Sequence, residues 1–154
     1  MKLFFLLIFF VLASSSCTAE SNKNIKYTGD EISIKFKKIQ EFSVDYEVDG
    51  GGPVFDKKIK IYKVDSQGKC AIVSKIDGDS GVYGTEAILY FSKSKVFDGY
   101  RLNYSYSFVD GENSKKRDKL NYLDPLVKIE KNELEKEFNN YRINFSKETL
   151  KECG

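Results

Sequence analysis

The 154-residue sequence contains no histidine and no tryptophan, and it has only two prolines and one methionine. Without histidine, neither a Ser-His-Asp triad nor a Cys-His pair can be built, and the commonest protein ligand of transition metals is missing. Any catalysis would depend on carboxylates, lysine, serine or tyrosine. The composition therefore favours a protein that is not an enzyme and that carries no metal or cofactor.

Two acidic patterns are too weak to change this interpretation. Asp45 and Glu47 share one side of an expected strand, as a glycosidase pair could, but charged side chains mostly form solvated surfaces. Asp77 and Asp79 are spaced like the first two ligands of a calcium loop. Ile88 then stands where the bidentate glutamate of such a loop would be. A tight turn is the better interpretation of this segment.

The N-terminus has the pattern of an export signal. A single positive charge at Lys2 precedes an apolar run that is too short to span a bilayer as a helix, and small residues follow. This predicts a signal peptide over residues 1–19, with cleavage after Ala19. The alternative is lipidation of Cys17 as in bacterial lipoproteins, although Ser14 stands where a lipobox has an aliphatic residue. We expect a secreted or periplasmic protein that meets the membrane only if it is lipidated.

The mature chain, residues 20–154, has the length of one domain. Without Lys2 it carries 24 basic residues (25 less one) and 23 acidic residues. This balance argues against a partner such as nucleic acid and against a strongly membrane-attracted surface. It leaves a protein partner or a neutral ligand as open alternatives.

The sequence has three cysteines, and the predicted export determines their expected oxidation state. Once Cys17 is removed or lipidated, Cys70 and Cys153 remain in an oxidising compartment, where a disulfide is the expected state. The bond would attach the C-terminus to the body of the fold.

Alternation of apolar and polar residues predicts a fold of class α+β that is mainly β. The expected strands are 31–37, 42–48, 58–64, 70–76, 85–91, 100–109 and a short one at 126–129. They are joined by a longer loop or a wide hairpin at 92–99 and followed by a polar loop at 110–119. A helical stripe of Leu134, Phe138, Tyr141 and Phe145 then predicts one C-terminal helix over about 132–145. Ser146 could cap a last helical turn. Short connections predict an antiparallel meander of six or seven strands, as an open sheet, an open barrel or a sandwich.

The segment from Tyr100 to Val109 has the largest apolar row, and it includes Tyr100, Tyr104 and Tyr106. Tyrosine is common where one end of a side chain is buried and the other is wet. The row therefore predicts either a ligand-binding or protein-binding face, or a sheet face packed on the C-terminal helix. Covered sheet faces are the general rule, which favours the packing interpretation.

Two further motifs are candidates for interaction. Lys115, Lys116 and Arg117 could bind an acidic partner, although a short charge run in a loop is more often only solvated. Asn103 and Asn144 begin N-glycosylation sequons, which matter only in a eukaryotic secretory pathway.

Taken together, these features favour a non-catalytic extracytoplasmic protein that binds another protein, in an inhibitor or immunity-type role. The alternative is a carrier of a small apolar ligand inside a β-barrel. A meander with a C-terminal helix resembles the lipocalins in architecture alone, because the Gly-x-Trp signature of that family needs a tryptophan.

Overall fold

The computed structural model describes residues 26–47, 54–78, 82–107, 119–123 and 125–154. The predicted signal peptide with Cys17, and the basic residues Lys115, Lys116 and Arg117, lie outside these ranges.

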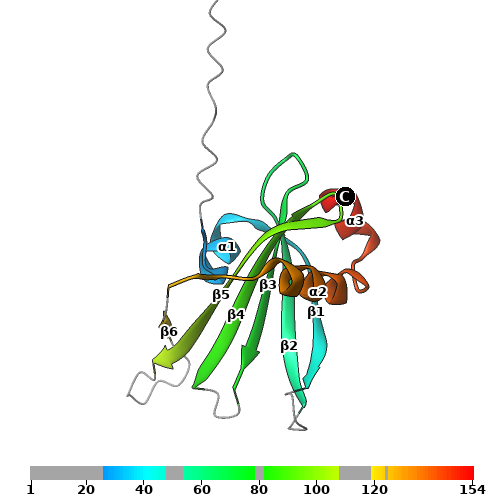
Figure 1. Ribbon diagram of the computed structural model, residues 1–154. Coiled ribbons are helices and arrows are strands. Elements are labelled where there is room, and N and C mark those ends of the chain that lie inside the picture. Colours follow the sequence, from blue (N-terminus) through cyan, green and yellow to red (C-terminus); the bar gives the residue numbers. More distant parts are fainter. Residues whose placement is uncertain (1–25, 48–53, 79–81, 108–118, 124) are drawn as a thin grey trace, which may run out of the picture.

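The described residues form one antiparallel sheet whose first six strands lie side by side in chain order (Figure 1). The strands are β1 (Lys37–Glu47), β2 (Val54–Lys63), β3 (Cys70–Asp77), β4 (Tyr83–Ser92), β5 (Lys95–Ser107), β6 (Lys119–Tyr122) and β7 (Val127–Lys128). β7 pairs with β5, and β1 does not pair with β6, so the sheet is not closed. The predicted mainly β meander is confirmed, in its open form rather than as a barrel.

Three short helices accompany the sheet. They are α1 (Gly29–Lys35), α2 (Lys131–Arg142) and α3 (Lys147–Cys153). α2 confirms the predicted C-terminal helix, although it ends at Arg142 and not near residue 145. A turn separates it from α3. As expected, Ser146 caps the last helix, and its side chain accepts a hydrogen bond from the Thr149 amide at 3.1 Å.

The predicted first strand at 31–37 is wrong, because this segment forms α1. The Thr28 side chain accepts from the Glu31 amide, and the Glu31 carboxylate accepts from the Thr28 amide. This capping box satisfies two amides that no helical carbonyl could reach, and it starts a helix in a segment whose apolar residues alternate like those of a strand. β1 begins only at Lys37.

The segment 92–99, predicted as a longer loop or a wide hairpin, forms a tight hairpin. Only Lys93 and Ser94 form the turn, and both have positive φ, at 49° and 58°. Two such residues make a two-residue hairpin turn whose twist matches the strands on either side, so β5 starts at Lys95. At the end of the expected polar loop at 110–119, β6 begins at Lys119.

Each face of the sheet is covered by different helices. We call the face under α2 and α3 the front face and the face under α1 the back face. The front core contains Ile59, Ile61, Cys70, Ile72, Ala87, Leu89, Phe91, Ile129, Leu134, Phe138, Tyr141 and Cys153. The back core contains Ile32, Tyr62, Ala71, Val73, Ile88 and Leu102. Neighbours such as Ile72 and Val73 belong to opposite cores because successive side chains of a strand point to opposite faces.

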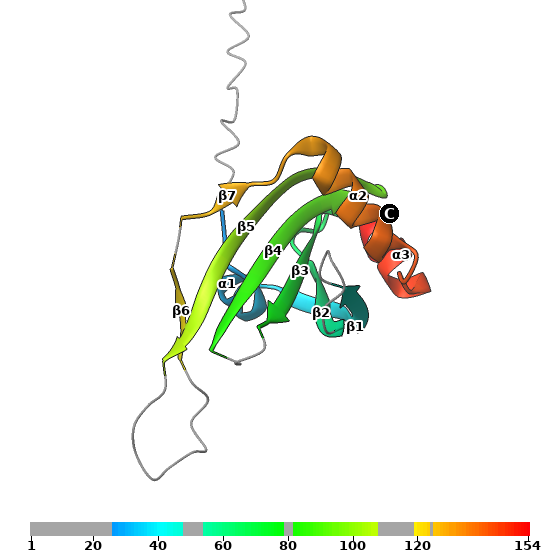
Figure 2. The ribbon, with the colours of Figure 1, turned by 60° about the horizontal axis from the view of Figure 1, so that its bottom comes forward.

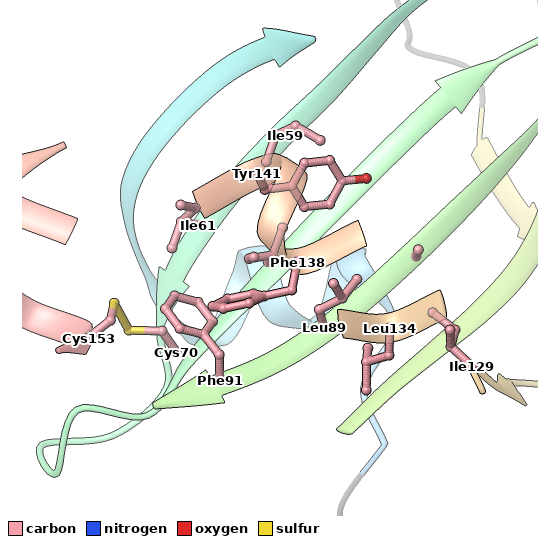
Figure 3. Close-up of a cluster of buried hydrophobic side chains, with 12 residues drawn as sticks. Ile59, Ile61, Cys70, Leu89, Phe91, Ile129, Leu134, Phe138, Tyr141 and Cys153 are labelled. Carbon is pink, nitrogen blue, oxygen red and sulfur yellow. A yellow bond between two sulfur atoms is a disulfide. The ribbon is translucent and has the colours of Figure 1, made fainter. Parts of the chain in front are cut away.

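The expected disulfide is present. Cys70 of β3 and Cys153 of α3 are bonded and both are buried, beside Phe91 and Phe138 (Figure 3). The amide of Lys93 also donates to the Cys153 carbonyl at 2.9 Å. The C-terminus is therefore attached to the front face.

The expectation that the tyrosine row of β5 packs on the C-terminal helix is wrong. Tyr100 lies opposite Ile88, and Leu102 belongs to the back core. The row therefore lies on the face that α1 covers. Gly99 and Arg101 face α2 instead: a methyl group on Gly99 would meet Leu134, and Arg101 contacts Glu133 at 2.8 Å.

Candidate functional site

Strand register aligns the front-face side chains in rows across the sheet. Val44 is paired with Lys57, Ile76 with Thr85, and Thr85 with Asn103. In the next row, farther along the strands from α2, Tyr83 is paired with Ser105, and Ser105 with Asn121. We call these two rows the front strip; its members are Val44, Tyr46, Lys57, Ile76, Gly78, Tyr83, Thr85, Asn103, Ser105, Asn121 and Leu123.

The front strip lies where the strands continue past the helices. Figure 2 shows β4 and β5 running on beyond α2 and α3 toward β6. The side chain of Tyr83 is 59% exposed and that of Leu123 is 53% exposed. The front core therefore ends under α2, where Val44 and Lys57 form the border of the strip. Beyond this border, the strip is a sheet face that no described helix covers.

Two open hollows meet on this face at Asn103. The first, of about 400 Å³, lies among Ile76, Tyr83, Thr85 and Leu123. The second, of about 440 Å³, lies between β5, β7 and the start of α2, where Val127 forms part of its wall. The strip is therefore a continuous surface with shallow, open hollows and no enclosed cavity among the described residues.

The front strip is nearly free of charge. Lys57 is its one charged member, and the Lys57 ammonium lies 2.6 Å from Glu137 of α2. The back faces of the same strands carry many charged side chains: Glu41, Asp45, Lys58, Lys60, Lys75 and Glu86. Since 31% of the whole sequence is charged, the strip differs sharply from the rest of the surface.

The border between strip and helix is fixed by Glu137. Besides Lys57, its carboxylate accepts from the Tyr141 hydroxyl at 2.5 Å and lies 3.3 Å from Arg101. Burial alone would raise the pKa of Glu137, but the charges of Lys57 and Arg101 and the Tyr141 hydrogen bond lower it below its ordinary value. The polar groups at this border are thus occupied with holding α2 on the sheet.

A second buried carboxylate lies on the back face. Glu86 is 0% exposed; one oxygen accepts from the Gly29 amide at 2.6 Å, and the other lies 2.9 Å from the Lys75 ammonium. Burial raises the pKa of Glu86, against the lowering effect of Lys75. Tyr122 of β6 donates to Glu86 at 3.4 Å, and Lys75 also contacts Asp30 at 3.1 Å. This cluster joins α1 to three strands and has a structural role.

The tyrosines that the sequence predicted for binding lie together on the back face, and their hydroxyls bond to carboxylates of the fold. Tyr100 is 4% exposed, and it donates to Asp98 at 2.5 Å. Tyr104 is fully buried, and both it and Tyr106 donate to Asp77, at 2.6 and 3.0 Å. Burial raises the pKa of Tyr100 to about 12. Their rings thus lie on the back face, away from the front strip.

The other predicted positions fall in different places. Asn103 is exposed on the front strip, and Asn144 is exposed in the turn between α2 and α3. Asp77 of the rejected calcium pattern accepts the two tyrosine hydroxyls, and Asp79 lies outside the described residues. Within the described ranges, no group of three or more acidic or cysteine side chains could hold a metal ion.

Sequence reasoning missed Tyr83, Leu123 and Tyr46 as candidates. The available signal was the run of uncharged residues at alternate positions of β4, which reads Tyr83, Thr85, Ala87. That signal does not show where helix cover ends, because the extent of α2 over the sheet is a property of the packed fold.

No protein-family model, curated protein or solved structure matches this chain. Among the residues described, none of the helices combines the length and the apolar character that crossing a bilayer requires.

Proposed function

We propose that the mature protein works outside the cytoplasm as a non-catalytic protein that binds another protein through the front strip. The observation that carries this proposal is the strip itself, an uncovered and almost uncharged sheet face in a charge-rich chain. An inhibitor or immunity-type role fits such a surface.

The composition of the strip supports a protein partner. The centres of protein interfaces are depleted in charge and enriched in aromatic residues. Antibody paratopes are rich in tyrosine, serine, asparagine and glycine. The strip contains the same residue types: Tyr46, Tyr83, Ser105, Asn103 and Gly78. Tyrosine gives a large contact area at a small entropic cost, and the short polar side chains adapt their hydrogen bonds to the partner.

Two features support the extracytoplasmic part of the proposal. The N-terminal sequence has the pattern of a signal peptide, and the Cys70–Cys153 disulfide is of the kind that persists in oxidising compartments. The alternative of an apolar-ligand carrier gains no support from the fold, because the open sheet does not enclose a barrel interior.

The experiment compares capture by matched variants. The mature protein, immobilised through its N-terminus, is exposed to its native extracytoplasmic surroundings, and bound proteins are identified by mass spectrometry. Tyr83→Asp places a charge in the strip, whereas Ile143→Asp makes a similar change at a residue that is 84% exposed at the end of α2. We expect one partner to be captured by the wild type and by Ile143→Asp, and to be lost with Tyr83→Asp.

A salt series and a third variant separate this proposal from binding through the basic residues. Contacts with an uncharged strip are little screened, so capture should persist in high salt. Replacement of Lys115, Lys116 and Arg117 by serine should leave capture intact. Loss of the partner with the serine variant, but not with Tyr83→Asp, would show that the strip is not the binding surface.

A further inference from the structure

The front strip contains the sequon Asn103-Tyr104-Ser105. Asn103 and Ser105 project on the front face, whereas Tyr104 is buried on the back face. Asn103 is exposed, and it lines both hollows. The acceptor residue of the sequon therefore stands on the front strip, at the point where the two hollows meet.

The surroundings of Asn103 suit a bound sugar chain. Its side-chain oxygen accepts from the Thr85 hydroxyl at 3.2 Å, and glycosylation leaves this oxygen in place because the sugar is attached to the nitrogen. The neighbouring Tyr83 ring offers an apolar surface with a polar tip, and the first hollow provides open space beside it. Among the described residues, the first hollow has no charged residue in its walls that would have to be desolvated, whereas the second is lined by Arg101, Lys128, Glu130 and Glu133.

We propose that Asn103 carries an N-linked glycan that lies over the front strip. In the transfer, the side-chain nitrogen of Asn103 forms a bond to the first sugar carbon of a lipid-diphosphate-linked oligosaccharide. The bond from that carbon to the phosphate oxygen breaks, the lipid diphosphate leaves, and the amide nitrogen loses one proton. The predicted signal peptide brings the chain to the compartment where eukaryotic cells carry out this transfer.

The position of the glycan gives it a regulatory consequence, which rests on the proposed function. A bulky chain at Asn103 prevents a protein from packing closely on Tyr83 and Leu123, so the glycosylated form has a masked strip. Asn144 differs, because it lies in the turn between α2 and α3, where a glycan would leave the strip open.

The test begins with the protein secreted by its own cells. Intact mass and peptide mapping before and after treatment with peptide-N-glycosidase are expected to show an oligosaccharide at Asn103, with an aspartate left at that position after release. An unmodified Asn103 in this protein would overturn the proposal.

A matched pair of variants, secreted from a eukaryotic host with Asn144→Gln in the background, then tests the masking. Ser105→Thr keeps the sequon, and Ser105→Ala destroys it while Asn103 remains. Hydroxyl-radical labelling of Tyr83 is expected to be several-fold lower in Ser105→Thr than in Ser105→Ala, with Ile143 labelled equally in both. Equal labelling of Tyr83 would disprove the masking. No partner is used, so failure of the protein-binding proposal leaves this result unaffected.

Discussion

Gly29 allows α1 to lie directly against the back face. A methyl group at this position would come within 2.3 Å of the Glu86 carboxylate and 2.6 Å of Val73, which is far closer than van der Waals contact. We therefore expect Gly29→Ala to destabilise the fold by about 1–3 kcal/mol, as overpacking does. Urea unfolding measures this loss. Gly78→Ala, whose added carbon would lie 3.3 Å from one backbone oxygen, is the milder control.

Two buried carboxylates on opposite faces should respond to pH with opposite signs. The pKa of Glu86 is raised from 4.5, so the folded state holds a proton that the unfolded state has lost as pH rises above that value. Stability from this site is greatest in acid and falls as pH rises toward the folded pKa. The pKa of Glu137 is lowered, so its stabilisation is present above 4.5 and is lost as pH falls through the folded pKa.

The measurement is the free energy of unfolding between pH 3 and about 7 for the wild type, Glu86→Gln and Glu137→Gln. Relative to wild type, Glu86→Gln should gain stability as pH rises above 4.5, because it lacks the buried ionisable group. Glu137→Gln should instead be less stable than wild type above pH 4.5, and this difference in the free energy of unfolding should shrink as the pH falls. The same pH trend in both variants would contradict the assignment of opposite environments.

At the scale of the element, one side chain makes the apolar contact of α1 with the back core. Ile32 is fully buried in the back core, whereas Ile34 of the same helix is 83% exposed. Ile32→Ala should cost about 2–4 kcal/mol, the range for a large-to-small change in a core. Ile34→Ala should change stability by less than about 0.5 kcal/mol, as exposed substitutions usually do. Thermal unfolding of the two variants checks the contrast, and equal losses would show that the segment is packed on both sides.

The same pair explains what the sequence could and could not predict. β1 to β5 were predicted approximately, because alternation of apolar and polar residues is a direct consequence of strand geometry. Ile32, Ile34 and Phe36 also alternate, yet the capping box at Thr28 decides for a helix. The turn at Lys93 and Ser94 was missed because its positive φ values occur without glycine or asparagine. A capping box decided the structure of the first segment and two positive φ angles decided that of the second. Alternation of apolar and polar side chains indicates neither.

On the front face, the disulfide attaches α3 to β3. Cys70 and Cys153 are separated by 83 residues, and the chain-entropy model gives such a closure up to about 4.5 kcal/mol. We expect the double variant Cys70→Ser, Cys153→Ser to lose about 2–4 kcal/mol, because measured effects usually fall below the model. In hydrogen exchange, α3 should lose protection first. An unchanged midpoint in urea would mean that the helices alone hold the C-terminus in place.

At the scale of the molecule, the candidate site exists because the helices cover only part of the front face of the sheet. The sequence identifies which residues of β4 and β5 share a face, but the length of sheet that α2 covers depends on packing among Leu134, Phe138 and the strands. The tyrosine row was more conspicuous in sequence, and its hydroxyls turned out to bond to Asp77 and Asp98 inside the fold. The aromatic pattern of the sequence was therefore stronger on the buried back face of β5 than on the exposed front strip.

Both cores share the same strands, so the molecule should unfold as one unit. Val73 and Ile72 are neighbours in β3 but belong to the back and front cores, and neither core can keep its strands if the other loses them. We expect Ile32→Ala on the back face and Phe138→Ala on the front face each to shift a single transition. Far-ultraviolet circular dichroism and tyrosine fluorescence should then give coincident urea curves for both variants, as two-state unfolding requires. A biphasic curve for Ile32→Ala, with the front core surviving the loss of α1, would show that the two faces are stabilised independently.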